Sequence, residues 1–177
     1  IAEWTHAAGA RLFVDAAQLA PHRPVSMMPD DDPRHIDFLA LSAHKMYAPF
    51  GTGALIGPKE FFEQGEPDMV GGGAVDIVTL DHAHWNHPPH KEEAGTPNVM
   101  GGIAFAAAIG VLETVGMETI ARHETELLRY AYTKLRRMPG IVLYGPTEQL
   151  DDKVGTIAFN VEGKHNSLVA AILGVEG

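Results

Sequence analysis

The stretch Leu41–Gly57, LSAHKMYAPFGTGALIG, places a lysine at the end of an apolar run and follows it with a turn that contains glycines. Lysine ammonium groups are strongly hydrated and normally lie on protein surfaces. A lysine that closes a buried strand therefore either extends its ammonium group back to water or has a chemical task. Lys45 poses this choice, and the rest of the sequence bears on the answer.

The first half of the chain alternates between helix and strand patterns. A helix pattern closes at Gly9, and apolar runs predict strands that end near Asp15 and Ser42, with a third short strand at 53–57. Continuous apolar runs are typical of strands covered on both faces, as in a parallel sheet flanked by helices. Residues 58–64 predict a helical turn, whereas residues 65–97 show no period, as is typical of a functional or mobile loop.

The second half of the chain predicts two long helices, near 98–115 and 117–137, followed by strands at 141–145 and 154–161 and a helix at 166–174. The second long helix is amphipathic, and its spacing places Leu127 and Leu128 on the inward face. The change of pattern predicts a second subdomain that begins beyond about Pro139.

Composition and charge bear on the partners and the location of the protein. Acidic residues outnumber basic ones by 23 to 13, the formal net charge is −10, and nucleic acid and anionic membranes are therefore poor partners. The most apolar stretch, 99–116, contains Glu113 and is shorter than the roughly 20 residues that cross a bilayer, so it predicts a buried helix. Because the sequence has neither a secretory leader pattern nor a cysteine, we expect a cytoplasmic protein.

Five polar residues lie at the ends of two predicted strands or just after them: Asp15, Gln18, Ser42, His44 and Lys45. Ligand groups in open α/β sheets gather at the carboxyl ends of strands, so we expect these residues to converge on one crevice. A carboxylate, neutral donors and an amine in one pocket suit pyridoxal phosphate (PLP), which a lysine binds covalently while a carboxylate keeps the pyridine nitrogen protonated. Taken singly, Asp15 also suits a helix cap, Gln18 a surface position and Ser42 an ordinary strand end.

Three blocks carry a resemblance to a known family: FVDAAQLAPHRPV (13–25), DFLALSAHKMYAPFGTGALIG (37–57) and EEAGTPNVMGGIAFAAAI (92–109). They resemble the class V aminotransferases of fold type I, and most of all the cysteine desulfurase and selenocysteine lyase branch. The resemblance implies an α/β, three-layer PLP-transferase-like portion of a large domain at 1–138. It also implies that residues 139–177 begin a smaller α+β C-terminal domain.

The same resemblance assigns roles to individual residues. Lys45 would be the Schiff-base lysine, Asp15 would pair with the pyridinium nitrogen, and Gln18 would face the phenolic oxygen of PLP. Ser42 and His44 would reach the phosphate, where short donors give charge-assisted hydrogen bonds.

The block AGTPN carries a further implied contact, because Thr96 matches a threonine that in related enzymes reaches the phosphate of the neighbouring subunit. A homodimer with shared sites is therefore implied, with a small amino acid as substrate and a sulfur-acceptor protein as a possible further partner.

Family members are considerably longer than this chain, so we expect a central fragment that is inactive by itself. The parent would be a PLP-dependent enzyme that cleaves a C–S or C–Se bond and gives alanine. Another class V reaction (transamination, epimerisation or C–S lysis) stays open, as does a non-catalytic role of the fragment alone, because the same cofactor chemistry serves each reaction.

Four histidines, His82, His84, His87 and His90, lie close together in HAHWNHPPH and suggest a metal site. This proline-rich loop has neither cysteine nor a helical histidine pair at four-residue spacing, and scaffolds normally orient metal ligands. We therefore expect no metal there.

Overall fold

The computed structural model describes residues 1–49 and 51–176, so Phe50 in the lysine block lies outside the described residues. The chain divides into two compact units. The first consists of Ile1–Pro21 with Val25–Thr114, and the second of His22–Pro24 with Val115–Gly177. The predicted large-domain and small-domain ranges, 1–138 and 139–177, concern the whole protein and stay a prediction.

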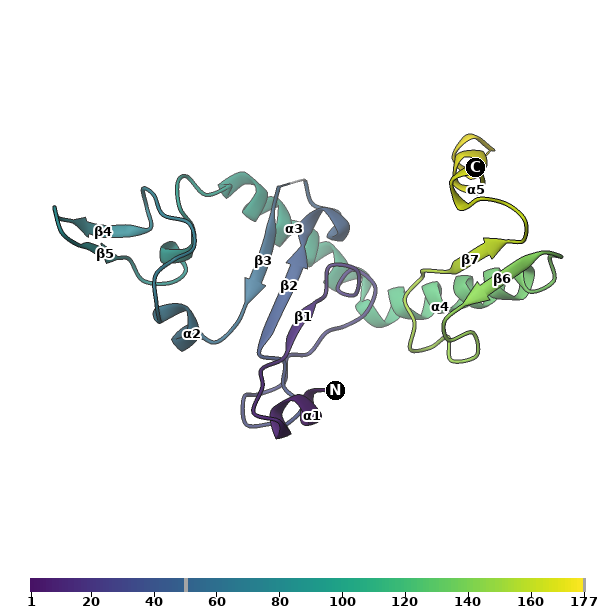
Figure 1. The fold of residues 1–177 in the computed structure, drawn as a ribbon, viewed down its shortest axis with the longest axis horizontal. Helices are drawn as coiled ribbons and strands as arrows, with labels where there is room; N and C mark the ends of the chain where they lie inside the picture. Colours follow the sequence, from purple (N-terminus) through teal and green to yellow (C-terminus); the bar gives the residue numbers. More distant parts are fainter. Residues whose placement is uncertain (50, 177) are drawn as a thin grey trace. The chain divides into compact units, whose positions relative to one another are not determined.

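A three-stranded sheet in the order β1-β2-β3 forms the centre of the first unit (Figure 1). Strands β1 (Phe13–Asp15) and β2 (Phe38–Ser42) are parallel, and β3 (Gly53–Ile56) is antiparallel to β2. All three strands lie where the sequence predicts them. The direction of β3 departs from a parallel sheet because residues 43–52 are too few for the crossover, about a dozen residues or more, that a parallel neighbour requires.

Aromatic rings cover one part of this sheet. Phe38 is buried, and its ring makes edge contacts with Phe61 at 4.8 Å and Phe62 at 6.2 Å between centroids. Both partners lie in the short helix α2 (Lys59–Glu63), whose preceding residue Pro58 has an extended backbone. A Cβ atom at Gly57 would lie 2.5 Å from the Phe38 ring, so glycine lets the chain pass over the ring.

Two further helices belong to the first unit: α1 (Ala2–Ala7) and α3 (Val99–Val115) up to Thr114. One face of α3 is buried, through Gly101, Phe105, Ala108 and Leu112. Within residues 1–49 and 51–176, no single helix is long and apolar enough to cross a membrane; α3 and α4 taken together, bent at a break, meet that test on length and composition alone.

The segment 65–97, predicted to be a loop, contains a β-hairpin. Strands β4 (Val75–Val78) and β5 (Ala83–Trp85) are antiparallel, and Figure 1 shows them as a separate two-stranded ribbon. Thr79 closes the turn, because its backbone N–H and hydroxyl both donate to the His82 carbonyl, at 2.8 and 3.0 Å. The prediction of a loop without regular structure is therefore wrong at β4 and β5.

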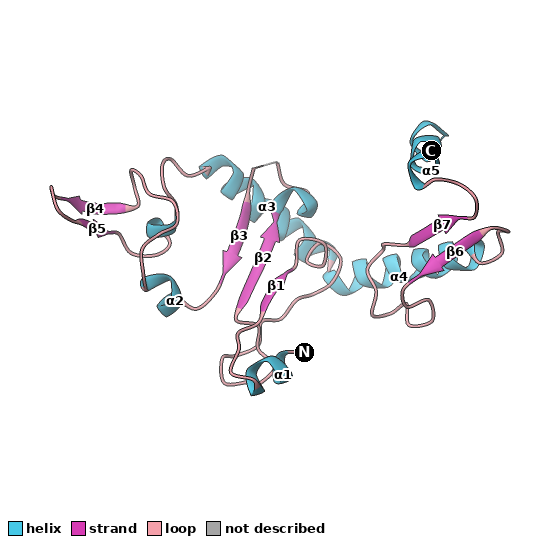
Figure 2. Ribbon diagram, in the orientation of Figure 1, coloured by secondary structure: helices cyan, strands magenta, loops and turns pink. Residues whose placement is uncertain are grey.

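The second unit consists of helix α4 (Met117–Leu135), the antiparallel pair β6 (Ile141–Tyr144) and β7 (Ala158–Val161), and helix α5 (Asn166–Glu176) (Figure 2). Leu128, Tyr132 and Leu150 form its core, against which Leu143 and Ile157 pack. Leu127 was predicted to face inward, but its side chain is 55% exposed, so that prediction is wrong. Leu128 faces the core as predicted.

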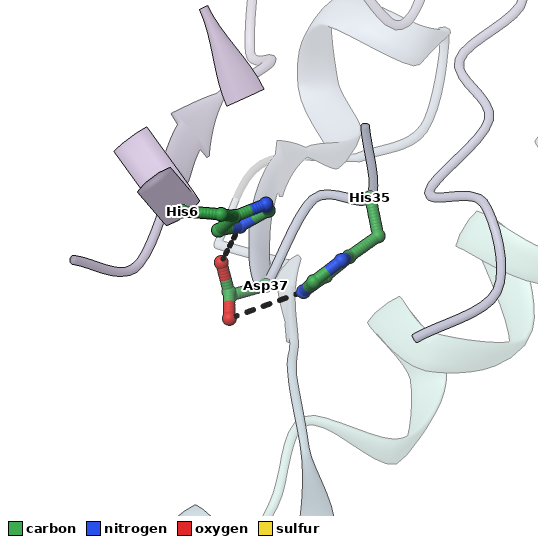
Figure 3. A group of neighbouring side chains, drawn as sticks. All are labelled: His6, His35 and Asp37. Carbon is green, nitrogen blue, oxygen red and sulfur yellow. Dashed lines mark hydrogen bonds and ion pairs between the residues drawn. The ribbon is translucent and has the colours of Figure 1, made fainter. Parts of the chain in front are cut away.

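A cluster of His6, His35 and Asp37 joins α1 to the start of β2 (Figure 3). Both imidazoles point to the Asp37 carboxylate, His6 Nε2 at 2.9 Å and His35 Nε2 at 3.5 Å, and the two rings are stacked at 4.1 Å. Their Nδ1 atoms lie 2.8 and 2.7 Å from the backbone carbonyls of Pro33 and Asp32. Asp37 also accepts the N–H of Leu12 at 2.7 Å, so the cluster holds the entry to β1 as well.

We expect this cluster to make local stability depend on pH. The hydrogen bond to Asp37, supported by the Pro33 carbonyl, raises the pKa of His6 above 6.5. Burial acts to raise the pKa of Asp37, but the N–H of Leu12 and the His6 ring outweigh it and hold that pKa below 3.8. His6 therefore contributes stability that is complete below pH 6.5 and is lost as the pH rises through its raised pKa. Asp37 contributes stability above pH 3.8 that is lost as the pH falls through its lowered pKa.

The measurement is hydrogen exchange of the Leu12 amide, corrected for its intrinsic pH dependence. Protection should fall as the pH rises above 6.5 in the wild type and stay level in His6→Gln. His123→Gln, at an exposed position on α4, is the control and should keep the wild-type profile. A His6→Gln profile that matches the wild type would show that the cluster does not titrate in this way.

Candidate cofactor site

The candidate site lies at the carboxyl ends of strands β1 and β2. Because β1 and β2 are parallel, with Asp15 opposite Ala40, their carboxyl ends lie at the same edge of the sheet. Asp15 closes β1, and its Oδ1 accepts the N–H of Ala17 at 3.0 Å, which fixes the carboxylate above the following turn. Gln18 lies in that turn, and both Asp15 and Gln18 are exposed.

Lys45 lies just beyond the end of β2, in the 3₁₀ helix η1 (Ala43–Met46). The turn is held at both ends: the Ala43 N–H donates to the Thr52 carbonyl at 3.1 Å, and the Ala48 N–H donates to the Ala43 carbonyl at 3.0 Å. Tyr47 closes η1 with a φ of 67°, a left-handed conformation that is uncommon outside glycine. The backbone therefore changes direction sharply at Tyr47, two residues after the lysine.

The Lys45 ammonium group has no hydrogen bond or ion pair with another residue in the described part of the chain, and its side chain is half-buried. Its neighbours differ. Lys59 pairs with Glu63 at 3.2 Å on the surface, and Lys91 is buried with its Nζ bonded to three backbone carbonyls. Of these three lysines, Lys45 therefore has the amine that is available for chemistry.

Ser42 and His44 lie on either side of the first residue of η1. Ser42 Oγ and His44 Nδ1 are 3.0 Å apart, within hydrogen-bond distance. This pair brings a hydroxyl and an imidazole to the same strand end as Lys45, and their role toward a phosphate stays a prediction.

Thr96 lies in a different segment, directly before α3, and its side chain is exposed. Among the described residues, no hydrogen bond joins it to Asp15, Ser42 or Lys45. The Gly95 N–H donates to the Gly72 carbonyl at 2.7 Å, which ties this segment to the chain before the β4–β5 hairpin. The role of Thr96 in a neighbouring site stays a prediction.

Within the described ranges 1–49 and 51–176, only His6, His35 and Asp37 bring three ligand atoms within 4.8 Å of one another. The four histidines of the segment 82–90 form no such group there. Sequence reasoning missed the His6 cluster because its members lie up to 31 positions apart and follow no local pattern.

The residues at the sheet edge fit PLP by their chemistry. The cofactor needs an amine for covalent attachment, an anionic partner for its ring nitrogen and donors for its phosphate. Lys45, Asp15 and the Ser42–His44 pair supply these groups from the ends of two adjacent parallel strands.

Comparison with known proteins then decides the family. Residues 1–177 match the family described as Aminotransferase class-V. The chain belongs to the class V aminotransferase family. The resemblance drawn from the three sequence blocks is thus confirmed, and this is a family of PLP-dependent enzymes.

Class V relatives of high similarity are cysteine desulfurases. A cysteine desulfurase of Haloferax volcanii is 38% identical over 177 residues, which are 100% of this chain and 40% of the relative. A probable cysteine desulfurase of Halalkalibacterium halodurans is 40% identical over 100% of this chain and 42% of its own length. The apo structure of a cysteine desulfurase from Thermococcus onnurineus NA1 matches 95% of this chain and 41% of its own, with a TM-score of 0.82 and 40% identity.

The chain is therefore a homologue of cysteine desulfurases and a mixed α/β portion of a fold type I PLP enzyme. It spans 40 to 42% of the length of the curated relatives named above.

Gly53, which lies close to the Lys45 turn, allows the packing of the site to be tested. Gly53 lies opposite Ser42 in the β2–β3 pair, and a Cβ atom there would lie 2.6 Å from the Leu41 carbonyl oxygen. Because a backbone carbonyl cannot move aside without shifting β2, we expect Gly53→Ala to lower the free energy of unfolding by about 1–3 kcal/mol.

Denaturant titration measures this change. Gly110→Ala in α3 is the matched control, since a Cβ atom there would meet nothing within 4 Å, and it should be neutral or slightly stabilising. Gly53→Ala with wild-type stability would contradict the tight β2–β3 packing.

Proposed function

We propose that the whole protein is a PLP-dependent cysteine desulfurase, or a selenocysteine lyase of the same type, that converts its amino-acid substrate to alanine. One observation carries the proposal: an available lysine and an exposed carboxylate lie at the carboxyl ends of two adjacent parallel strands. The homology to cysteine desulfurases over the full length of the chain supports the choice of reaction.

Each residue of the site has a proposed task. Lys45 would hold the cofactor covalently, and Asp15, fixed by the Ala17 N–H, would keep a proton at the ring nitrogen. Ser42 and His44 would hold the phosphate, and Gln18 would donate to the phenolic oxygen. When bound, PLP supplies an electron sink for the bonds at the substrate's α-carbon.

The proposal includes the assembly of the whole protein. We infer a homodimer in which Thr96 reaches the phosphate of the neighbouring site, and a protein that accepts the sulfur. The exposed position of Thr96, with no hydrogen bond to Asp15, Ser42 or Lys45 among the described residues, supports this arrangement. The three-layer architecture and the cytoplasmic location predicted from the sequence belong to the same proposal.

The test is an assay of the whole protein, loaded with PLP, with cysteine and with selenocysteine as substrates. With a thiol reductant such as dithiothreitol present to reduce the released sulfur or selenium by two electrons, we expect alanine to form in step with sulfide or selenide over many turnovers, and the ratio of kcat/KM for the two substrates assigns the reaction. Pyruvate, a D-amino acid or an amino-group exchange product in place of alanine would reject desulfuration and favour another class V reaction.

A further inference from the structure

Asn98 connects two segments that the proposed function assigns to different sites. Its Nδ2 donates to the Gly51 carbonyl at 3.3 Å and lies 3.1 Å from Thr52 Oγ1, while its Oδ1 accepts the Gly101 N–H at 2.9 Å. The last of these bonds caps the first turn of α3. The first two instead cross to the chain that follows the Lys45 turn, 46 and 47 positions away.

Thr52 continues this connection to the lysine. Its hydroxyl is bonded to Asn98, and its backbone carbonyl accepts the N–H of Ala43. Ala43 is fully buried and begins η1, the 3₁₀ helix that carries Lys45. Thr52 is thus hydrogen-bonded to Asn98 through its side chain and to the lysine turn through its backbone carbonyl.

Gly101, in the first turn of α3, is packed tightly against Asn98 and Thr52. A Cβ atom at Gly101 would lie 2.5 Å from Asn98 Nδ2 and would overlap the Thr52 hydroxyl. The first turn of α3 therefore rests directly on Thr52. A shift of the Thr96 segment, which leads into α3, would be passed on to the Lys45 turn.

We propose that Asn98 is a positioning residue that fixes the Lys45 turn relative to the Thr96 segment. This inference rests on the proposed function, in which Lys45 and Thr96 serve PLP. The residue type supports it, because an amide offers donors to Gly51 and Thr52 and an acceptor to Gly101 at the same time. Aspartate would retain the helix cap but bring a carboxylate against the Gly51 carbonyl.

The experiment compares Asn98→Ala, Asn98→Asp, Thr52→Val and Thr52→Ser in the whole protein. The readouts are hydrogen exchange of the Ala43 amide without PLP, the rate of PLP loss on dilution, and the melting temperature. Asn98→Ala and Thr52→Val should speed both Ala43 exchange and PLP loss by about threefold to tenfold, as expected for the loss of one or two hydrogen bonds. Thr52→Ser keeps the hydroxyl and should stay close to wild type.

Asn98→Asp separates positioning from helix capping. An acidic residue at a helix start retains the cap and favours the helix dipole, so this variant should keep its melting temperature. We nevertheless expect it to lose PLP faster than wild type. Asn160→Ala, which removes an exposed amide bonded to Tyr144 in the second unit, is the matched control and should change neither rate.

Two outcomes overturn the inference and leave the proposed function intact. One is wild-type Ala43 exchange and PLP retention in Asn98→Ala; the other is a set of effects that follow the melting temperature alone, with Asn98→Asp behaving as wild type. If the wild-type protein does not hold PLP on Lys45 at all, the proposed function fails instead.

Discussion

Under the proposed function, replacing Lys45 with alanine should remove covalent PLP from the whole protein and lower the rate of desulfuration by about a thousandfold or more, because no other amine takes its place. The two nearest lysines in the sequence are already engaged. Lys59 pairs with Glu63 on the surface of α2, and Lys91 donates to three carbonyls while 2% exposed. Alanine production and the visible absorbance of the protein after gel filtration measure the two effects.

Lys59→Ala is the matched control for this experiment. An exposed ion pair four residues apart on a helix contributes only about 0.3–0.5 kcal/mol, so this variant should keep its cofactor and its rate. If Lys45→Ala retains a covalently bound cofactor, or if its rate stays within tenfold of wild type, Lys45 is not the lysine that holds the cofactor.

Lys91→Met should destabilise the segment around α2 by about 2–5 kcal/mol, since it leaves polar groups unpaired in a buried place. The Lys91 Nζ donates to the carbonyls of Phe62, Gln64 and Gly65 at 2.8, 3.1 and 2.8 Å. These carbonyls lie at the end of α2 and just beyond it, where the helix has no further N–H groups to offer. Methionine has a similar length but offers no donor.

Chemical unfolding gives the global change, and limited proteolysis between residues 58 and 97 shows whether this segment opens first. Lys164→Met makes the same substitution at an exposed position in the second unit and should change the stability by less than about 0.5 kcal/mol. If both variants unfold at the same denaturant concentration as the wild type, the three hydrogen bonds of Lys91 carry no net stability.

The sequence predicts the positions of the strand ends beside the candidate cofactor site for a physical reason. Asp15 and Ser42 each end a continuous apolar run, and the rule that parallel strands share a carboxyl edge brings them together without any knowledge of side-chain contacts. Lys45 follows within the same turn. Local pattern and one topological rule are sufficient to place these residues at one edge of the sheet, whereas their roles toward PLP stay a prediction.

Other features depend on contacts that no local pattern reveals. The β4–β5 hairpin is hidden because Gly71–Gly73 and nearby prolines interrupt the strand signal around Val75–Val78. Leu127 and Leu128 are consecutive residues that lie about 100° apart around α4. Which of the two faces the core depends on β6 and the segment near Leu150. The three carbonyls around Lys91 lie 26 to 29 positions earlier in the chain, so its burial follows only from the fold.

Reduction of the PLP-loaded whole protein with borohydride, followed by digestion and mass spectrometry of the peptides, tests the central claim most directly. The reduction fixes the cofactor on the amine that holds it. We predict that the added mass lies on the peptide that contains Lys45 and that Lys45→Ala abolishes it. A label on the peptide with Lys59 or Lys91, or no fixed label in a protein that is active with cysteine, would contradict the account.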